Sequence, residues 1–128
     1  MFAADRLILA TAVALLCPWA AQAASLCERT VLPFRAMVAA LKAEPGAQVL
    51  RDNGSVIEIE DQKRFIIWTL YKAHGDQPDA YICRRVVQED GQVKIWMSAE
   101  CVGRTLNCDG LIGRLLLEQN RATAPLRR

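Results

Sequence analysis

Residues 79–100, with the sequence DAYICRRVVQEDGQVKIWMSAE, decide the fold. Two segments rich in β-branched and aromatic residues flank Asp90-Gly91, a dipeptide that favours a two-residue hairpin turn because both residues tolerate positive φ. The pattern therefore predicts antiparallel strands over 79–88 and 92–100. The two faces of this hairpin differ: one carries Ile82, Val86, Val93, Ile95 and Met97, and the other carries Tyr81, Lys94, Ser98 and Glu100.

Three further strands are expected before this hairpin. Asn53-Gly54 predicts a type I′ turn between 47–51 and 55–60, and Asp61-Gln62 allows a reversal into 63–72. The loop 74–78 then leads into 79–88. The sequence thus predicts an antiparallel meander of about five strands.

Helical periodicity flanks the strands on both sides. Ser25 to Glu28 fits a capping box, and Pro33 then requires either a kink or a new helix start near Thr30. The first buried stripe consists of Phe34, Met37, Val38 and Leu41, and Pro45-Gly46 ends it. The second consists of Cys108, Leu111, Ile112, Leu115 and Leu116, with Asn107 or Asp109 as its cap.

The predicted fold class is therefore α+β: an N-terminal helix, the meander, and a C-terminal helix packed on the sheet. We expect a single domain over 24–119 and a flexible tail over 120–128, because the tail is polar and contains Pro125.

The first 23 residues are typical of a secretory signal peptide. Arg6 precedes the apolar run 7–16, and Ala21-Gln22-Ala23 provides a cleavage site. The run is too short to span a bilayer, so no transmembrane segment is expected after cleavage. Lipidation of Cys17 is disfavoured because it follows Leu16 rather than a small residue. The predicted location is the periplasm or the exterior.

Export makes disulfides the expected state of Cys27, Cys83, Cys101 and Cys108. The favoured pairing is Cys27 with Cys83 and Cys101 with Cys108, since a symmetric 79–100 hairpin places Cys83 and Cys101 on opposite faces. Cys27 with Cys108 and Cys83 with Cys101 is the alternative. Zinc is disfavoured because the six residues between Cys101 and Cys108 exceed the spacing of structural zinc sites.

Composition gives little support to nucleic-acid binding or catalysis. The net charge is +2 and the basic residues are scattered, whereas nucleic-acid readers usually carry a basic patch. His74 is the single histidine, and Asp76 and Asp79 lie close to it in sequence. These three residues are a weak metal signal, and we expect no metal and no cofactor.

The register of the last three predicted strands suggests an interaction surface. If the strands turn symmetrically about Gln77 and about Asp90-Gly91, Trp68, Arg85 and Trp96 form one row, with the Arg85 guanidinium between two indoles. Tyr81 shares that face. The alternative is that the face is core, because Leu50, Ile57, Ile59 and Ile66 also fall on it.

Two classes of function follow. The first is a non-enzymatic binding or accessory protein, such as an inhibitor, an adaptor or a subunit of an envelope assembly, whose partner is another envelope or extracellular protein. Trp68, Arg85, Trp96 and Tyr81 are its candidate contact residues. The second is a small exported hydrolase-like enzyme that uses His74 with Asp76 or Asp79. We expect Trp96 to be at least partly exposed, because Lys94 and Ser98 share its side of the strand.

Overall fold

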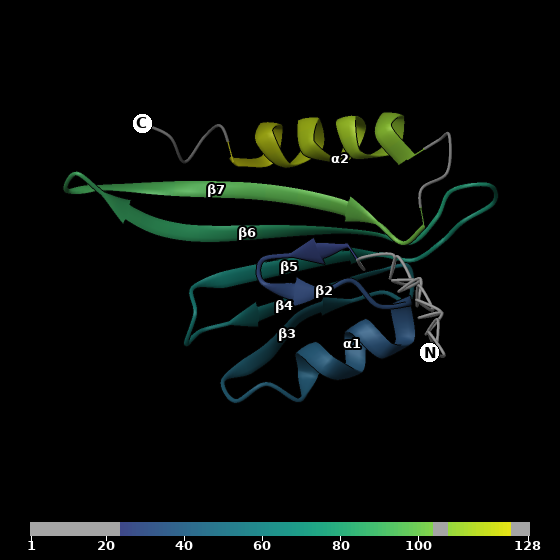
Figure 1. Cartoon of the computed structure of the whole chain (residues 1–128), viewed down its shortest axis with the longest axis horizontal. Coiled ribbons are helices and arrows are strands. Elements are labelled where there is room, and N and C mark those ends of the chain that lie inside the picture. Colours follow the sequence, from purple (N-terminus) through teal and green to yellow (C-terminus); the bar gives the residue numbers. More distant parts are fainter. Residues whose placement is uncertain (1–23, 104–107, 124–128) are drawn as a thin grey trace, which may run out of the picture.

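A computed structural model describes residues 24–103 and 108–123 and shows a five-stranded antiparallel sheet with two helices (Figure 1). A short hairpin, β1 (Ser25–Leu26) and β2 (Arg29–Thr30), is followed by α1 (Phe34–Lys42). The sheet strands are β3 (Ala47–Asp52), β4 (Val56–Asp61), β5 (Ile66–Tyr71), β6 (Ala80–Glu89) and β7 (Gln92–Cys101), in that spatial order. The last element is α2 (Cys108–Thr123). The α+β class and the five-strand meander are confirmed.

Both faces of the sheet are covered, because its strands alternate apolar side chains toward two cores. Against one face pack Met37 and Leu41 of α1 together with Leu26 of the β1–β2 hairpin. They cover Ile57, Ile59, Ile66, Trp68, Leu70, Tyr81 and Cys83. Against the other face packs α2, whose Leu111 and Leu115 lie on Ala80 and Ile82. The expected packing of the C-terminal helix on the sheet is therefore confirmed.

The helix expected to start at Ser25 is wrong, because this segment is a hairpin. Cys27 and Glu28 form its turn with φ values of 47° and 65°, and Ser25 pairs with Thr30. A helix requires negative φ at both positions. The helix begins only at Phe34, directly after Pro33, whose extended backbone (φ −53°, ψ 152°) and missing N–H separate it from the hairpin.

The turns between β3 and β4 and between β6 and β7 differ in how well the sequence predicted them. Asp90 and Gly91 have φ values of 52° and 74°, as expected for a type I′ turn. The other turn lies one residue later than expected, with Gly54 and Ser55 in its centre. The side-chain oxygen of Asn53 accepts hydrogen bonds from the N–H groups of Ser55 and Val56, so Asn53 stabilises the turn from outside its centre.

A bulge at Leu50 is the second difference in this hairpin. The register of β3 against β4 shifts between Val49 and Arg51. Leu50 is 47% exposed, so it does not share the buried face with Ile57 and Ile59 as the sequence pattern predicted.

The predicted row of Trp68, Arg85 and Trp96 is wrong in its register. Mutual backbone hydrogen bonds between His74 and Gln77 close a tight turn around Gly75 and Asp76, so the reversal is centred before Gln77. Trp68 is therefore opposite Cys83, and the actual row is Ile66, Arg85 and Trp96. A slip of two residues keeps every side chain on its face but changes its neighbours.

Element ends also differ from expectation. β5 begins at Ile66 rather than at residue 63, because Phe65 has a φ of 56° and belongs to the preceding turn. α2 continues to Thr123, beyond the expected start of the tail at residue 120. The predicted signal peptide, the Asn107 cap and the remainder of the tail lie outside the described residues.

Candidate binding surface

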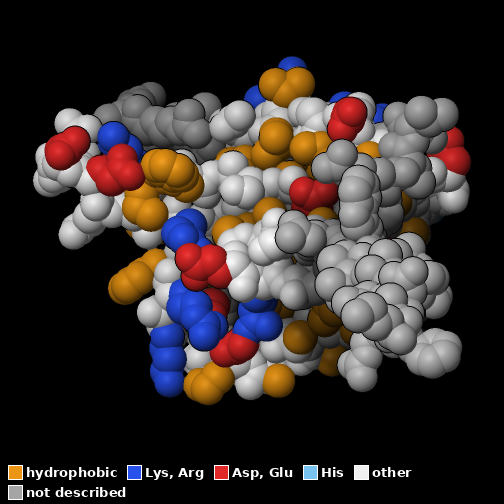
Figure 2. Space-filling model, in the orientation of Figure 1, with side chains coloured by type: hydrophobic (Ala, Val, Ile, Leu, Met, Phe, Trp, Pro, Cys, Tyr) orange, Lys and Arg blue, Asp and Glu red, His pale blue; other side chains and the backbone are white. Residues whose placement is uncertain are grey.

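A pocket of about 740 Å³ opens on the face of the sheet that carries α1 and the β1–β2 hairpin. Its lining includes Cys27, Ile66 and Trp68 together with three arginines, Arg29, Arg64 and Arg85. The other lining residues are Glu28, Thr30, Leu32 and Asp61. We call this cavity the arginine pocket. Figure 2 shows basic and acidic side chains gathered on the left half of the visible face, below the β6–β7 hairpin.

Acidic neighbours hold two of the three arginines in place. Glu44, just after α1, forms ion pairs with both Arg29 and Arg64, the latter with N and O atoms 3.0 Å apart. Arg64 also pairs with the carboxylate of Asp61 at 3.0 Å, and Asp61 is buried. Carboxylates that are already present therefore engage the guanidinium groups of Arg29 and Arg64.

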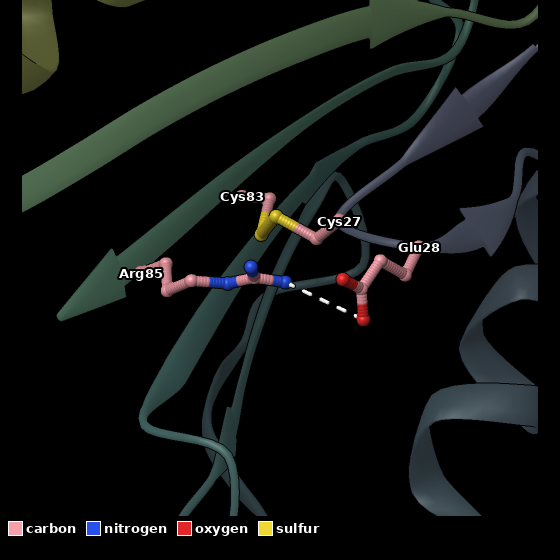
Figure 3. The surroundings of a disulfide bond; sticks show 4 residues. All are labelled: Cys27, Glu28, Cys83 and Arg85. Carbon is pink, nitrogen blue, oxygen red and sulfur yellow. Dashed lines mark ion pairs between the residues drawn. A yellow bond between two sulfur atoms is a disulfide. The ribbon is translucent and has the colours of Figure 1, made fainter. Parts of the chain in front are cut away.

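Arg85 has a much weaker ion pair. Its side chain extends from β6 beside the Cys27–Cys83 disulfide toward Glu28 in the β1–β2 turn (Figure 3). The closest nitrogen and oxygen of the two side chains are 4.0 Å apart, and the Glu28 side chain is 87% exposed. Water and salt screen such a pair strongly. Of the three arginines that line the pocket, Arg85 is thus the one most available to a new anionic partner.

Exposed apolar side chains lie next to Arg85. Trp96 is directly opposite Arg85 on β7, on the same face, and is 56% exposed. Phe65 is 67% exposed, and its carbonyl accepts a hydrogen bond from the N–H of Val86, the next residue of β6. Tryptophan and arginine side by side at a surface are the residue types that most often dominate protein–protein binding energy.

The end of the β6–β7 hairpin exposes further apolar side chains on its opposite face. β6 pairs with β5 only as far as Arg85, and the hairpin extends past the ends of the other three strands (Figure 1). Val86, Val93 and Ile95 in this extension are 41%, 65% and 46% exposed. These three side chains lie on the α2 side of the hairpin, whereas Trp96 lies on the side of the arginine pocket.

Of the four candidate contact residues, Arg85 and Trp96 lie at the surface and Trp68 and Tyr81 lie in the core. The exposed fractions are 1% for Trp68 and 0% for Tyr81. The Tyr81 hydroxyl donates a 2.6 Å hydrogen bond to the carbonyl of Leu32. Burial, with a smaller contribution from the Asp79 carboxylate, raises the pKa of Tyr81 well above its usual range. The expected exposure of Trp96 is confirmed.

Asp79, a candidate partner of His74 in catalysis, has two structural hydrogen bonds. One carboxylate oxygen accepts a 2.6 Å hydrogen bond from the N–H of Ala73, and the other accepts a 3.4 Å bond from the N–H of Phe34. It thereby ties the His74 loop to the start of α1, where an acceptor satisfies a backbone donor at the helix start. Both carboxylate oxygens of Asp79 thus accept a backbone hydrogen bond.

No group of three histidine, cysteine, aspartate or glutamate side chains within 24–103 and 108–123 is placed to hold a metal ion. In the same residues, no helix has the length and apolar character to cross a bilayer.

The part of the chain that the structure describes contains two disulfides, Cys27–Cys83 and Cys101–Cys108, which is the pairing that the sequence favoured. The first ties the β1–β2 turn to the sheet, and the second ties the end of β7 to the start of α2. Disulfides are compatible with an oxidising compartment.

Sequence reasoning missed Arg29 and Arg64, which come from the β1–β2 hairpin and from the turn before β5. Their grouping depends on the left-handed turn at Cys27 and Glu28, for which the sequence offers no Gly or Asn as a signal. No protein-family model, curated protein or solved structure matches this chain. Because a fold alone does not define an activity, the functional interpretation rests on these residues.

Proposed function

We propose that this chain is an exported, disulfide-stabilised binding protein that recognises an acidic segment of another envelope or extracellular protein. The contact surface is the rim of the arginine pocket formed by Arg85 and Trp96. The observation that supports this most directly is Arg85 itself, whose ion pair across 4.0 Å involves a highly exposed Glu28.

The chemistry of Arg85 suits a carboxylate from a partner. A guanidinium can donate two parallel hydrogen bonds to one carboxylate, and such charge-assisted pairs are stronger than neutral hydrogen bonds. A partner that buries this pair would also exclude the water that now screens it. Trp96, directly opposite Arg85, offers a large apolar surface that the same partner would cover.

Capture from an envelope extract, followed by affinity measurement with the partner identified, tests the proposal. Trp96→Ala is expected to weaken binding by about 2 kcal/mol or more, as for a hot-spot residue. Arg85→Gln is expected to weaken it comparably, and Arg85→Lys to restore only part of the loss, because lysine keeps the charge but not the fork of donors.

Leu50→Ala is the matched control. Leu50 is an exposed apolar residue on β3, at the opposite edge of the sheet, and its replacement should leave affinity unchanged. Stability is measured in parallel: Trp96→Ala should lose little, whereas Trp68→Ala should lose about 3 to 5 kcal/mol. Equal affinities for wild type, Trp96→Ala and Arg85→Gln would contradict the proposed surface.

A further inference from the structure

β7 is an edge strand with a long outer edge. It lies at one end of the sheet order, and no other strand of the described residues pairs with its outer side. Residues 92–96 are exposed, and the strand extends over ten residues without a proline. Proteins usually protect such an edge with a proline, a bulge, a charge or a covering element, because its backbone groups can pair with another strand.

The hairpin geometry shows which backbone groups face outward. A two-residue loop is closed by a hydrogen-bonded pair, here Glu89 and Gln92, and hydrogen-bonded pairs then alternate along the ladder. The N–H of Val86 bonds to Phe65, on the β5 side, which agrees with this alternation. Residues 93, 95, 97, 99 and 101 of β7 therefore direct their N–H and C=O groups to the outer edge.

The side chains of β7 are complementary to those of a second β7 in antiparallel orientation. The strand has two charged residues, Lys94 and Glu100, placed symmetrically about Met97. When two copies pair with Met97 opposite Met97, each Lys94 is opposite the Glu100 of the other copy. Met97 also belongs to the set whose backbone groups face outward, so a two-fold axis at this residue gives a regular hydrogen-bonded ladder.

The remaining pairs of this register also match in polarity. Ile95 is opposite Ala99, and Val93 is opposite Cys101, all on the face that α2 covers. Trp96 is opposite Ser98 on the other face. Val93 and Ile95, which are 65% and 46% exposed in one copy, would thus lie beside Ala99 and Cys101 of the other copy, where α2 already packs.

We propose that two copies of this chain associate through the outer edges of β7, antiparallel and centred on Met97, to form one continuous ten-stranded sheet. A two-fold axis perpendicular to the sheet keeps equivalent faces on the same side. The two arginine pockets then open on one face of the dimer. This inference does not depend on the proposed recognition of an acidic segment.

Sedimentation equilibrium of the protein produced from the full sequence tests the pairing. The wild type is expected to show a monomer–dimer equilibrium. Lys94→Glu alone and Glu100→Lys alone each place like charges opposite one another at two symmetric positions, so each should weaken the dimer about tenfold or more.

A charge exchange tests the register itself. An equimolar mixture of the Lys94→Glu and Glu100→Lys variants restores opposite charges at both positions, so it should form a heterodimer that neither variant matches alone. The double variant Lys94→Glu/Glu100→Lys should recover the wild-type dimer. A wild type that stays monomeric at its highest soluble concentration, or a mixture without recovery, would overturn the proposal.

Proline substitutions separate edge pairing from other contacts. Ile95→Pro removes an outward N–H, which proline tolerates on an edge strand, so the fold should persist while the dimer is lost. Trp96→Pro removes an N–H that bonds to β6 and should instead destabilise the monomer. Circular dichroism and thermal unfolding establish that Ile95→Pro is folded. A folded Ile95→Pro variant with an unchanged dimer constant would contradict pairing through this edge.

Discussion

Tyr81 combines a polar group with complete burial, and its hydroxyl bonds to the segment that precedes α1. The hydrogen bond to the Leu32 carbonyl is 2.6 Å long, while the ring is fully buried among the residues that α1 covers. Burial opposes ionisation because the phenolate would lose its hydration, and the nearby Asp79 carboxylate adds repulsion. The neutral form of Tyr81 is therefore part of what holds α1 and the sheet together.

We predict that stability falls at alkaline pH through Tyr81. Its pKa is raised in the folded state, whereas in the unfolded chain it ionises near pH 10. Above about pH 10 the unfolded state therefore binds fewer protons than the folded state, so the free energy of unfolding decreases as pH rises. Tyr81→Phe should cost about 1 kcal/mol at neutral pH and show a shallower alkaline decline.

Urea unfolding of wild type and Tyr81→Phe between about pH 8 and pH 11 measures this difference. The comparison cancels the contributions of the lysines and of Tyr71, which both proteins share. Parallel pH profiles would show that the Tyr81 hydroxyl does not couple ionisation to folding.

At the scale of elements, each disulfide joins a covering layer to the sheet. Cys27–Cys83 fixes the β1–β2 turn on one face, and Cys101–Cys108 fixes the start of α2 on the other. The loops that they close differ greatly, with sequence separations of 56 and 7 residues. A longer closed loop removes more conformational entropy from the unfolded chain.

The two bridges are thus predicted to contribute unequally to stability. Loop closure implies about 4 kcal/mol for Cys27–Cys83 and about 2.5 kcal/mol for Cys101–Cys108. The double variant Cys27→Ala/Cys83→Ala should therefore lower the melting temperature by well over 10 °C, at roughly 4 to 8 °C per kcal/mol, and Cys101→Ala/Cys108→Ala by less. Calorimetry measures both. The reverse order would show that local strain or packing, rather than loop closure, sets their contributions.

Elements with a strong local signal were predictable from sequence, and elements determined by tertiary contacts were not. Asp90-Gly91 fixed the last hairpin because few dipeptides accept two positive φ angles, and β7 was therefore placed correctly against β6. The β1–β2 hairpin was missed because its left-handed turn is at Cys27 and Glu28. The loop before β6 has turn-forming residues at several positions. The sequence pattern therefore placed the centre of the reversal at Gln77, whereas the turn is formed around Gly75 and Asp76.

The candidate site shows the same division. Arg85 opposite Trp96 followed from the well-predicted hairpin, and that pair is present at the surface. Trp68 belonged to the adjacent and misjudged register, so its place beside Arg85 was wrong. Arg29 and Arg64 reach the pocket from two separate segments, and no local pattern indicates their convergence.

The whole molecule is a sheet with a covering layer on each face. The surfaces that we propose for partner binding and for dimer formation are parts of the sheet that these layers leave exposed. α1 with the β1–β2 hairpin covers one face, and α2 covers the other. The end of the β6–β7 hairpin, including residues 92–96 of β7, remains exposed beyond both layers. The two disulfides are compatible with an oxidising compartment, as the proposed export requires.

Export can be tested through the cysteines of the whole chain. The sequence has five cysteines, and the two disulfides use four, so Cys17 is the remaining one. If signal cleavage occurs after Ala23, we predict that the purified protein has an intact mass that begins at Ala24 and no reactive thiol under denaturing, non-reducing conditions. The control Ala23→Leu replaces the small residue required before the cleavage point and should retain Cys17, giving one thiol per chain. One thiol in the wild type would mean that the leader is not removed, and more than one would contradict the two disulfides.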